Sequence, residues 1–157
     1  MDAIETREQA IERELGPVVR FLRVVWALDH ALTRKSKQMH RTMGVTGTQR
    51  FVLRLVAQRP GLSAGELARL LHLDPSTLTG VLARLTGRGA LERLPDAADG
   101  RRALFRVSRA GRALATTRLG TVEACAWKAL RRAPPDDVRA TVRVLTAMVE
   151  SLEPGDP

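Results

Sequence analysis

The chain has few of the residues on which several protein classes depend. Its 157 residues include one cysteine, Cys125, no tyrosine and only 3% aromatic residues. A single cysteine excludes an intramolecular disulfide framework. No apolar run approaches the roughly 18 residues that a membrane span needs, and the charged N-terminus has no signal-peptide core. These absences predict a cytoplasmic protein made of one domain, or of one domain with dimerisation arms.

Catalytic and metal-binding motifs are scarce as well. No pair of residues has zinc-type spacing such as Cys-x-x-Cys or His-x-x-x-His, so Asp29 and His30 would need distant partners to hold a metal. Cys125 has apolar neighbours, which indicates packing rather than thiol sensing. We find no glycine-rich phosphate loop and no persuasive Ser-His-Asp order. We therefore expect no enzyme, no metal and no cofactor.

Positive charge is concentrated in the middle of the sequence. The formal net charge is +9. Residues 41–110 hold 12 basic and 5 acidic residues, whereas the segments on either side each have an excess of only +1. All twelve basic residues are arginines, which suit bidentate contacts to phosphates and bases. This clustering predicts a polyanionic partner.

Local signals predict a largely helical chain. Apolar spacing indicates helices over 3–15 and 18–43. Capping boxes at Thr46-x-x-Gln49 and Ser63-x-x-Glu66 begin two short helices, and Asp74-Pro75 begins a third that ends at Gly89. The residues expected to face inward are Phe51, Val52, Leu55 and Val56, then Leu67, Leu70 and Leu71, then Leu78, Val81, Leu82 and Leu85.

The second half begins with a predicted hairpin. Segments 90–94 and 103–108 have strand character and are joined by PDAADGRR, with Phe105 and Val107 facing the core. Ser108 is expected to cap a long helix over about 109–131. Pro134-Pro135-Asp136-Asp137 opens the last helix. Its apolar residues form a heptad-like seam longer than a small domain needs for itself: Val138, Val142, Leu145, Val149 and Leu152.

Three short helices and a hairpin describe a winged helix-turn-helix, a mainly α fold with a small β-hairpin wing. The third helix is then the recognition helix in the major groove, where hydroxyl side chains bind phosphates or bases. A plain three-helix bundle with a solvated face is the alternative, and the local charge excess argues against it. The outward face of the third helix carries Ser76, Thr77, Gly80, Arg84 and Arg88, with Thr79 at its margin.

Three stretches of the sequence resemble the MarR family of winged-helix transcriptional regulators. They are TGTQRFVLRLV, LSAGELARLLHLDPSTLTGVLARLTGRGALER and PDAADGRRALFRVSRAG. In the last stretch, Asp96, Asp99, Arg101, Ser108 and Gly111 match the order of the family's wing. The resemblance implies N-terminal dimerisation helices at 1–43, a winged helix-turn-helix at 44–111 and C-terminal dimerisation helices at 112–157.

The resemblance also implies a function. Such proteins are homodimers that bind a pseudo-palindromic operator in double-stranded DNA, usually as repressors, and are often released by a small organic effector. Many relatives carry a larger basic residue where this chain has Gly80. We therefore expect recognition of DNA shape by the wing to contribute more to specificity than direct base contacts at this position. By position, Ser76, Thr77, Thr79 and Arg84 would contact the major groove, Arg101 would enter the minor groove held by Asp99 or Asp96, and Arg88 and Arg102 would add phosphate contacts.

An effector pocket is expected where the first long helix meets the DNA-binding domain. Its candidate lining residues are Arg23, Trp26, His30 and Met39, since aromatic and soft groups suit a flat organic ligand. Trp26 could equally be core at a dimer seam. Two other functions stay open at this point: a low-specificity or architectural DNA binder, and a protein-interaction module that uses the winged helix as a docking surface.

Overall fold

A computed structural model of the chain describes residue 11 and residues 14–152. The chain divides into two compact units, Met1–Thr117 and Arg118–Pro157. The helix predicted over 3–15 lies almost entirely outside the described residues. The predicted dimerisation segments, 1–43 and 112–157, are not tested by this division and stay predictions.

The long helix α2 (Pro17–Met43) lies in unit 1 and is close to the predicted range. Proline occupies its first turn, where a missing N–H costs nothing. Gly44 ends the helix with a φ of 71°, and its N–H donates to the His40 carbonyl at 2.9 Å. Met39 is the one buried residue of α2. Most of the helix surface is therefore exposed, its apolar side chains included.

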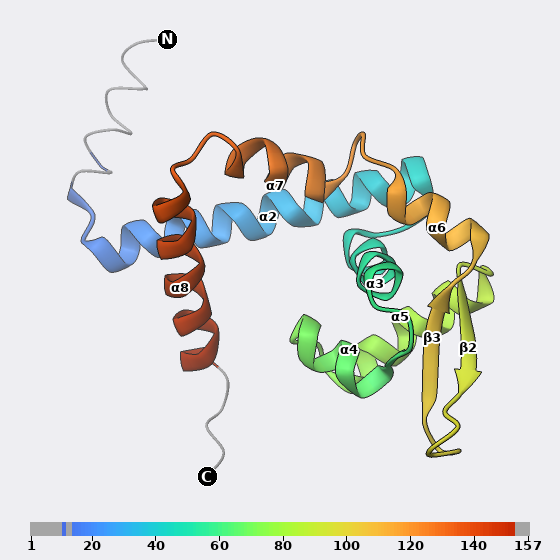
Figure 1. Ribbon diagram of the computed structural model, residues 1–157. Helices are drawn as coiled ribbons and strands as arrows, with labels where there is room; N and C mark the ends of the chain where they lie inside the picture. Colours follow the sequence, from blue (N-terminus) through green and yellow to red (C-terminus); the bar gives the residue numbers. More distant parts are fainter. Residues whose placement is uncertain (1–10, 12–13, 153–157) are drawn as a thin grey trace. The chain divides into compact units, whose positions relative to one another are not determined.

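The next three helices begin where the sequence predicts them (Figure 1). They are α3 (Gly47–Gln58), α4 (Ala64–Leu71) and α5 (Pro75–Gly87). Both capping boxes are confirmed, because Thr46 with Gln49 and Ser63 with Glu66 exchange side-chain and backbone hydrogen bonds. Pro75 begins α5 as predicted, although Asp74 makes no side-chain cap.

The wing belongs to a three-stranded antiparallel sheet in the order β1-β3-β2. β2 (Leu91–Pro95) and β3 (Ala103–Val107) form the predicted hairpin, with Leu91 opposite Val107. The additional strand, β1 (Leu62–Ser63), pairs with Phe105 and Leu104 of β3. Two residues are too few to show alternation, so the sequence had no signal for β1.

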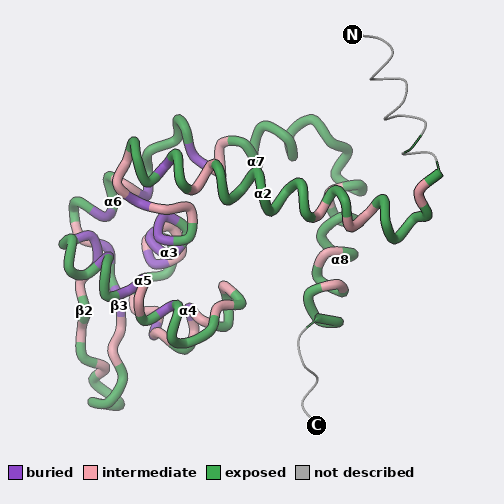
Figure 2. The backbone as a smooth tube through the Cα atoms, turned by 180° about the vertical axis from the view of Figure 1, so that it is seen from behind, coloured by how far each residue is buried: buried purple, intermediate pink, exposed green. Residues whose placement is uncertain are grey.

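The core lies within the winged helix-turn-helix, and Figure 2 shows the buried segments gathered there. All four predicted core residues of α5 are buried, as are Phe105 and Val107. Two predictions are wrong: Phe51 is 49% exposed and Leu70 is 54% exposed. Leu53 is fully buried instead. At 100° per residue, the inward face of α3 centres on Val52, Leu53 and Val56, which turns Phe51 outward.

The helix predicted over 109–131 is two helices. Ser108 caps α6 (Arg109–Thr116) by accepting from the Gly111 N–H, as predicted. Gly111 packs so closely that an added Cβ would lie 1.9 Å from the Ala90 carbonyl oxygen. A break then precedes α7 (Val122–Leu130), with Gly120 at a φ of 75°. Left-handed backbone at Gly120 is incompatible with a continuous helix.

Unit 2 contains α7 and α8 (Pro135–Leu152). Thr121 caps α7, and Asp136 and Asp137 occupy the first turn of α8 as predicted. Neither helix contains a buried residue in the part of the chain that the structure describes. Both helices present exposed apolar side chains, among them Trp127 of α7 and Val142 of α8.

Candidate nucleic-acid interface

The turn between α4 and α5 sets the direction of the candidate recognition helix. His72 ends α4 in the left-handed region, with a φ of 48°. The Leu73 N–H donates to the Ala68 carbonyl at 3.1 Å, and Pro75 begins α5 two residues later. So short a connection, held by a backbone hydrogen bond, fixes where α5 begins relative to α4.

The two sides of α5 differ as predicted. Leu78, Val81, Leu82 and Leu85 are buried on one side. Ser76, Thr77, Thr79 and Arg84 are exposed on the rest of the helix. The Thr79 hydroxyl donates to the Pro75 carbonyl at 2.7 Å, so its oxygen lone pairs are still able to accept. The N-terminal half of α5 thus presents hydroxyl groups to solvent.

Gly80 lies in the middle of α5, and its α-carbon has open space around it. A Cβ built on Gly80 meets no atom within 4 Å. Packing within the chain therefore does not require glycine at this position. Glycine also lowers helix stability relative to alanine, so neither packing nor helix propensity within the chain favours glycine here.

Arg88 is at the other end of α5 and has a partner within the chain. It is the C-cap residue of α5, and its guanidinium donates to the Gly44 carbonyl at the end of α2. This contact ties two helix ends together. The phosphate contact predicted for Arg88 stays a prediction, and it would have to compete with Gly44.

The tip of the wing is braced by its two aspartates, and Asp99 holds Arg101 through the backbone. The Asp99 carboxylate accepts from the backbone N–H of Arg101 at 3.0 Å, and the Asp96 carboxylate accepts from the N–H of Ala98 at 2.9 Å. Neither carboxylate pairs with the Arg101 guanidinium. Within residue 11 and residues 14–152, that guanidinium has no hydrogen bond or ion pair.

Arg102, not Arg101, has its guanidinium close to Asp96, and it also contacts two residues that the sequence predicted only as a helix cap. Its guanidinium lies 3.8 Å from the Asp96 carboxylate, 3.6 Å from the Glu66 carboxylate and 3.2 Å from the Ser63 hydroxyl. Hydrogen bonds from the hydroxyl and the backbone N–H of Ser63 lower the pKa of Glu66, and the positive charges of Arg102 and Arg69 lower it further. Glu66 is therefore ionised at neutral pH.

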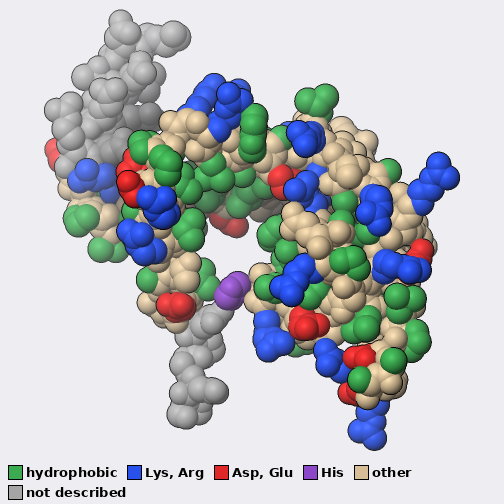
Figure 3. All heavy atoms as spheres, viewed as in Figure 1, with side chains coloured by type: hydrophobic (Ala, Val, Ile, Leu, Met, Phe, Trp, Pro, Cys, Tyr) green, Lys and Arg blue, Asp and Glu red, His purple; other side chains and the backbone are tan. Residues whose placement is uncertain are grey.

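An open groove of about 1070 Å³ lies between α4, α5 and the wing. Its floor includes the apolar side chains of Leu82 and Phe105. Figure 3 shows Lys and Arg side chains spread over α4 and the wing, with acidic groups among them. The polar side chains that line the groove are those of Ser63, Glu66, Arg69, Thr79, Thr86, Arg93, Arg101 and Arg102.

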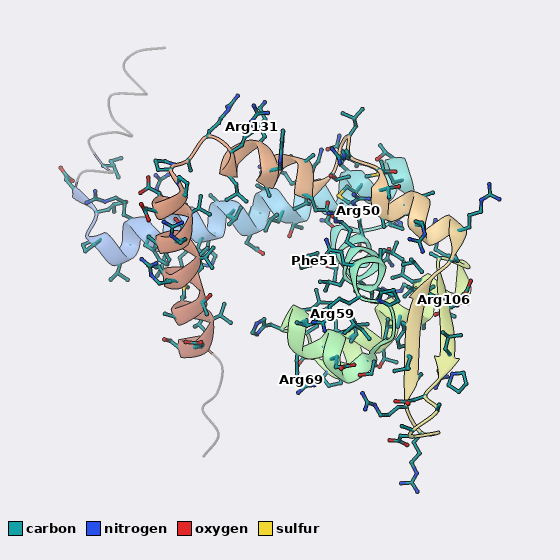
Figure 4. The ribbon with its side chains drawn as sticks, in the orientation of Figure 1. Arg50, Phe51, Arg59, Arg69, Arg106 and Arg131 are labelled. Carbon is teal, nitrogen blue, oxygen red and sulfur yellow. The ribbon has the colours of Figure 1, made fainter. Side chains whose placement is uncertain are left out.

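Two arginines of this groove were not singled out from the sequence. Arg69 lies on α4 and Arg93 on β2 (Arg69 is labelled in Figure 4). The charge excess over 41–110 includes both residues, but no local motif separates them from the other arginines. Their place beside Thr79 and Arg101 depends on how the sheet packs against α5.

The four residues predicted for an effector pocket do not share one surface. Trp26 is 60% exposed, and Arg23 and His30 are exposed on the same helix, α2. Nδ1 of His30 is hydrogen-bonded to the Trp26 carbonyl at 2.8 Å. Met39 is fully buried, because nine residues beyond His30 correspond to half a turn of rotation. The pocket itself stays a prediction.

No group of three or more His, Cys, Asp or Glu side chains in the described part of the chain is placed to hold a metal ion. Nor does any helix among those residues have the length and apolar character needed to cross a membrane.

Known proteins resemble this chain in sequence and fold. A model described as "MarR family" matches residues 45–103. The HTH-type transcriptional repressor Rv2887 of Mycobacterium tuberculosis is 33% identical over 103 residues, which are 66% of this chain and 74% of that protein. The HTH-type transcriptional repressor Mb2911 of Mycobacterium bovis matches equally well.

Solved structures agree with the fold. The S. aureus MepR–DNA complex aligns with a TM-score of 0.71 at 20% identity, over 85% of this chain and 98% of that one. The PcaV regulator of Streptomyces coelicolor, in complex with its natural ligand, aligns with a TM-score of 0.64 at 27% identity, over 80% and 92%. The predicted fold class, mainly helical with a small winged sheet, is confirmed.

Proposed function

The chain belongs to the MarR family of DNA-binding transcriptional regulators, and from this we propose that it is a homodimeric repressor of a two-fold-symmetric site in double-stranded DNA. The names of its relatives are those of regulators rather than enzymes. The observation that carries the proposal is the unpaired Arg101 guanidinium at the tip of the wing, beside a groove that α5 lines with hydroxyl groups.

We propose that α5 enters the major groove through its N-terminal half. Ser76, Thr77 and Thr79 are exposed there and offer hydroxyl groups to bases or phosphates. Arg84, one to two turns further along, would bind the phosphate backbone. Arg101 would enter the minor groove, because its backbone is held by Asp99 while its side chain is left unpaired.

The homodimer is supported by exposed apolar side chains on α2, α7 and α8. Val142 of α8 is 57% exposed, and Trp127 of α7 and Val18 of α2 are exposed as well. Helical stability in proteins depends mainly on packing of an apolar face. A second copy of the chain would provide that packing, and a two-fold dimer would match a two-fold-symmetric DNA site.

We also propose that a small organic effector releases the protein from its DNA site. PcaV was solved in complex with its natural ligand, and this chain is 27% identical to it. Exposed Trp26 and His30 on α2 offer an aromatic surface and a hydrogen-bonding ring to such a ligand.

The proposal is tested by footprinting the purified protein on the DNA that flanks its own gene. We expect protection of a symmetric site about two helical turns long. Arg101→Ala should lower affinity for a duplex of that site by about 1–3 kcal/mol without changing the fold measured by circular dichroism. Arg106→Ala, which removes an equal charge from β3, is the matched control.

Other outcomes of the same experiment favour other functions. Comparable affinity for the flanking DNA and for a random duplex would indicate an architectural or low-specificity binder. Failure to bind any duplex at low salt would remove the DNA-binding proposal and favour a protein-interaction module. Unchanged affinity of the Arg101 variant would remove the wing from the mechanism.

A further inference from the structure

Arg101 and Arg102 are adjacent in the sequence but differ in what surrounds their side chains. Arg101 has no side-chain partner within the described part of the chain, whereas Arg102 is surrounded by three acceptors. Two of these acceptors, Ser63 and Glu66, lie at the start of α4, and the third, Asp96, lies in the wing itself. Arg102 therefore joins the tip of the wing to the helix-turn-helix.

Ser63 is the fixed point of this contact. It is only 7% exposed and has three roles at once. As part of β1 it pairs with Leu104 of β3, and as the N-cap of α4 its hydroxyl accepts from the Glu66 N–H at 3.3 Å. That same hydroxyl also accepts from Arg102 at 3.2 Å. The position of Arg102 is thus set by a residue that belongs to both the sheet and α4.

Glu66 completes the contact and orients it. Its carboxylate accepts from the Ser63 N–H at 2.8 Å and from the Ser63 hydroxyl at 2.6 Å. Those two hydrogen bonds hold the carboxylate at the N-terminal end of α4, facing Arg102. Arg69 of α4 is the other cation that acts on Glu66, and Asp96 is the other carboxylate that acts on Arg102.

We propose that Arg102 is a positioning residue that clasps the wing to the N-terminus of α4 and so fixes the place of Arg101 relative to α5. This inference rests on the proposed DNA-binding function. A wing that is already in place loses less conformational freedom when it binds, so the clasp raises affinity without touching DNA. Arg102, Ser63, Glu66 and Asp96 together are called the wing clasp below.

The acceptors that Arg102 already has argue against a phosphate contact. The carboxylates of Asp96 and Glu66 lie 3.8 Å and 3.6 Å from its guanidinium. A phosphate that approached Arg102 would have to displace them. Exposed ion pairs are individually weak, each worth about 0–1 kcal/mol, so the effect of the clasp is expected on DNA binding more than on global stability.

The first test measures DNA affinity over a series of salt concentrations. The probes are the duplex protected in the footprint and a random duplex of equal length. We expect Arg102→Ala to weaken binding to the protected duplex by about tenfold while the slope of log Kd against log salt stays that of the wild type. Arg84→Ala, proposed as a phosphate contact, should reduce the slope by about one per subunit. A reduced slope for Arg102→Ala would make it a phosphate contact and overturn the proposal.

Two more variants define the clasp. Glu66→Gln keeps an oxygen for Ser63 but removes the charge that faces Arg102. We expect it to weaken binding in the same direction, and the double variant Glu66→Gln/Arg102→Ala to be no weaker than Arg102→Ala alone. Fully additive losses would overturn the clasp. Arg106→Ala is the matched control, because Arg106 pairs with Glu92 on β2 and touches no residue of the clasp (Arg106 is labelled in Figure 4).

The second test needs no DNA. Hydrogen–deuterium exchange of the free protein should become faster across 96–103 in Arg102→Ala, and should not do so in Arg106→Ala. Unchanged exchange in that segment would overturn the clasp even if the protein binds DNA. If the wild type binds no duplex, the proposed function fails while this measurement still decides whether the clasp holds the wing.

Discussion

At the scale of single residues, identical side chains have different roles because of neighbours far away in sequence. The sequence predicted DNA contacts for both Arg101 and Arg102. Glu66 is 36 residues before Arg102, and only the pairing of β1 with β3 brings them together. The wing motif was therefore recognisable from local residues. The different surroundings of Arg101 and Arg102 were not, because they depend on residues distant in sequence.

Gly80 allows a prediction in which stability and function move in opposite directions. Gly80→Ala should raise the free energy of unfolding by about 0.5–1 kcal/mol, because alanine is the better helix former and open space surrounds the new methyl group. The same methyl group should weaken binding to the protected duplex by about 1–3 kcal/mol, the usual cost of overfilling a close-packed contact.

The measurements are urea unfolding and a DNA titration of the same preparations. Gly87→Ala is the matched control, since it also lies in α5 with open space around it but at the far end from Ser76. We expect the control to keep wild-type affinity. A Gly80→Ala protein that binds DNA as tightly as the wild type would show that α5 does not approach DNA closely at this point.

At the scale of elements, the structure contains a buried arginine that the sequence patterns did not reveal. Arg50 of α3 is 1% exposed, and its guanidinium donates to the carbonyls of Leu114, Ala115 and Thr117 (Figure 4). These carbonyls lie at the end of α6, where backbone acceptors lose their helical partners and where positive charge is favourable. Arg50 thus caps α6 from another helix.

Arg50→Met should lower the free energy of unfolding by about 3 kcal/mol, because methionine fills similar space but leaves buried carbonyls without donors. Urea unfolding followed by circular dichroism measures the loss. Arg54→Met is the matched control: Arg54 lies one turn further along α3 and makes one bond, to the Ala115 carbonyl at 3.3 Å. Equal losses for the two variants would show that the carbonyl contacts do not account for the burial of Arg50.

Elements with a local chemical signal were predictable, and elements formed by long-range packing were not. The caps at Thr46, Ser63 and Ser108 depend on residues three positions apart and were found. β1 depends on its partner β3, and the orientation of Phe51 depends on which side of α3 meets the core. The break after Thr117 was missed because apolar spacing continued through it. Gly120 was the one local signal of a helix end in this segment, because glycine readily adopts the left-handed backbone found there.

At the scale of the whole molecule, the exposed apolar side chains of α7 and α8 support the proposed homodimer. Every residue of α7 and α8 is exposed or only partly covered in the described chain. The heptad-like seam of α8 was readable from the sequence, because a period of residues is a local property. Which surface would cover the seam could not be read from it, since in the proposed dimer that surface belongs to another molecule.

Val142→Glu tests whether that other molecule is a second copy. Val142 is already 57% exposed in the single chain, so a carboxylate there should not disturb the fold of a monomer. In a two-fold dimer it would be buried twice without a partner, which should weaken association by several kcal/mol, or at least about a hundredfold in the dimer dissociation constant. Sedimentation velocity over a range of concentrations measures the dimer dissociation constant.

Ala147→Glu is the matched control. It adds the same charge on the opposite side of α8, five residues and about 140° away, and should leave the dimer intact. If Val142→Glu dimerises as strongly as the wild type, the seam of α8 is not the dimer interface.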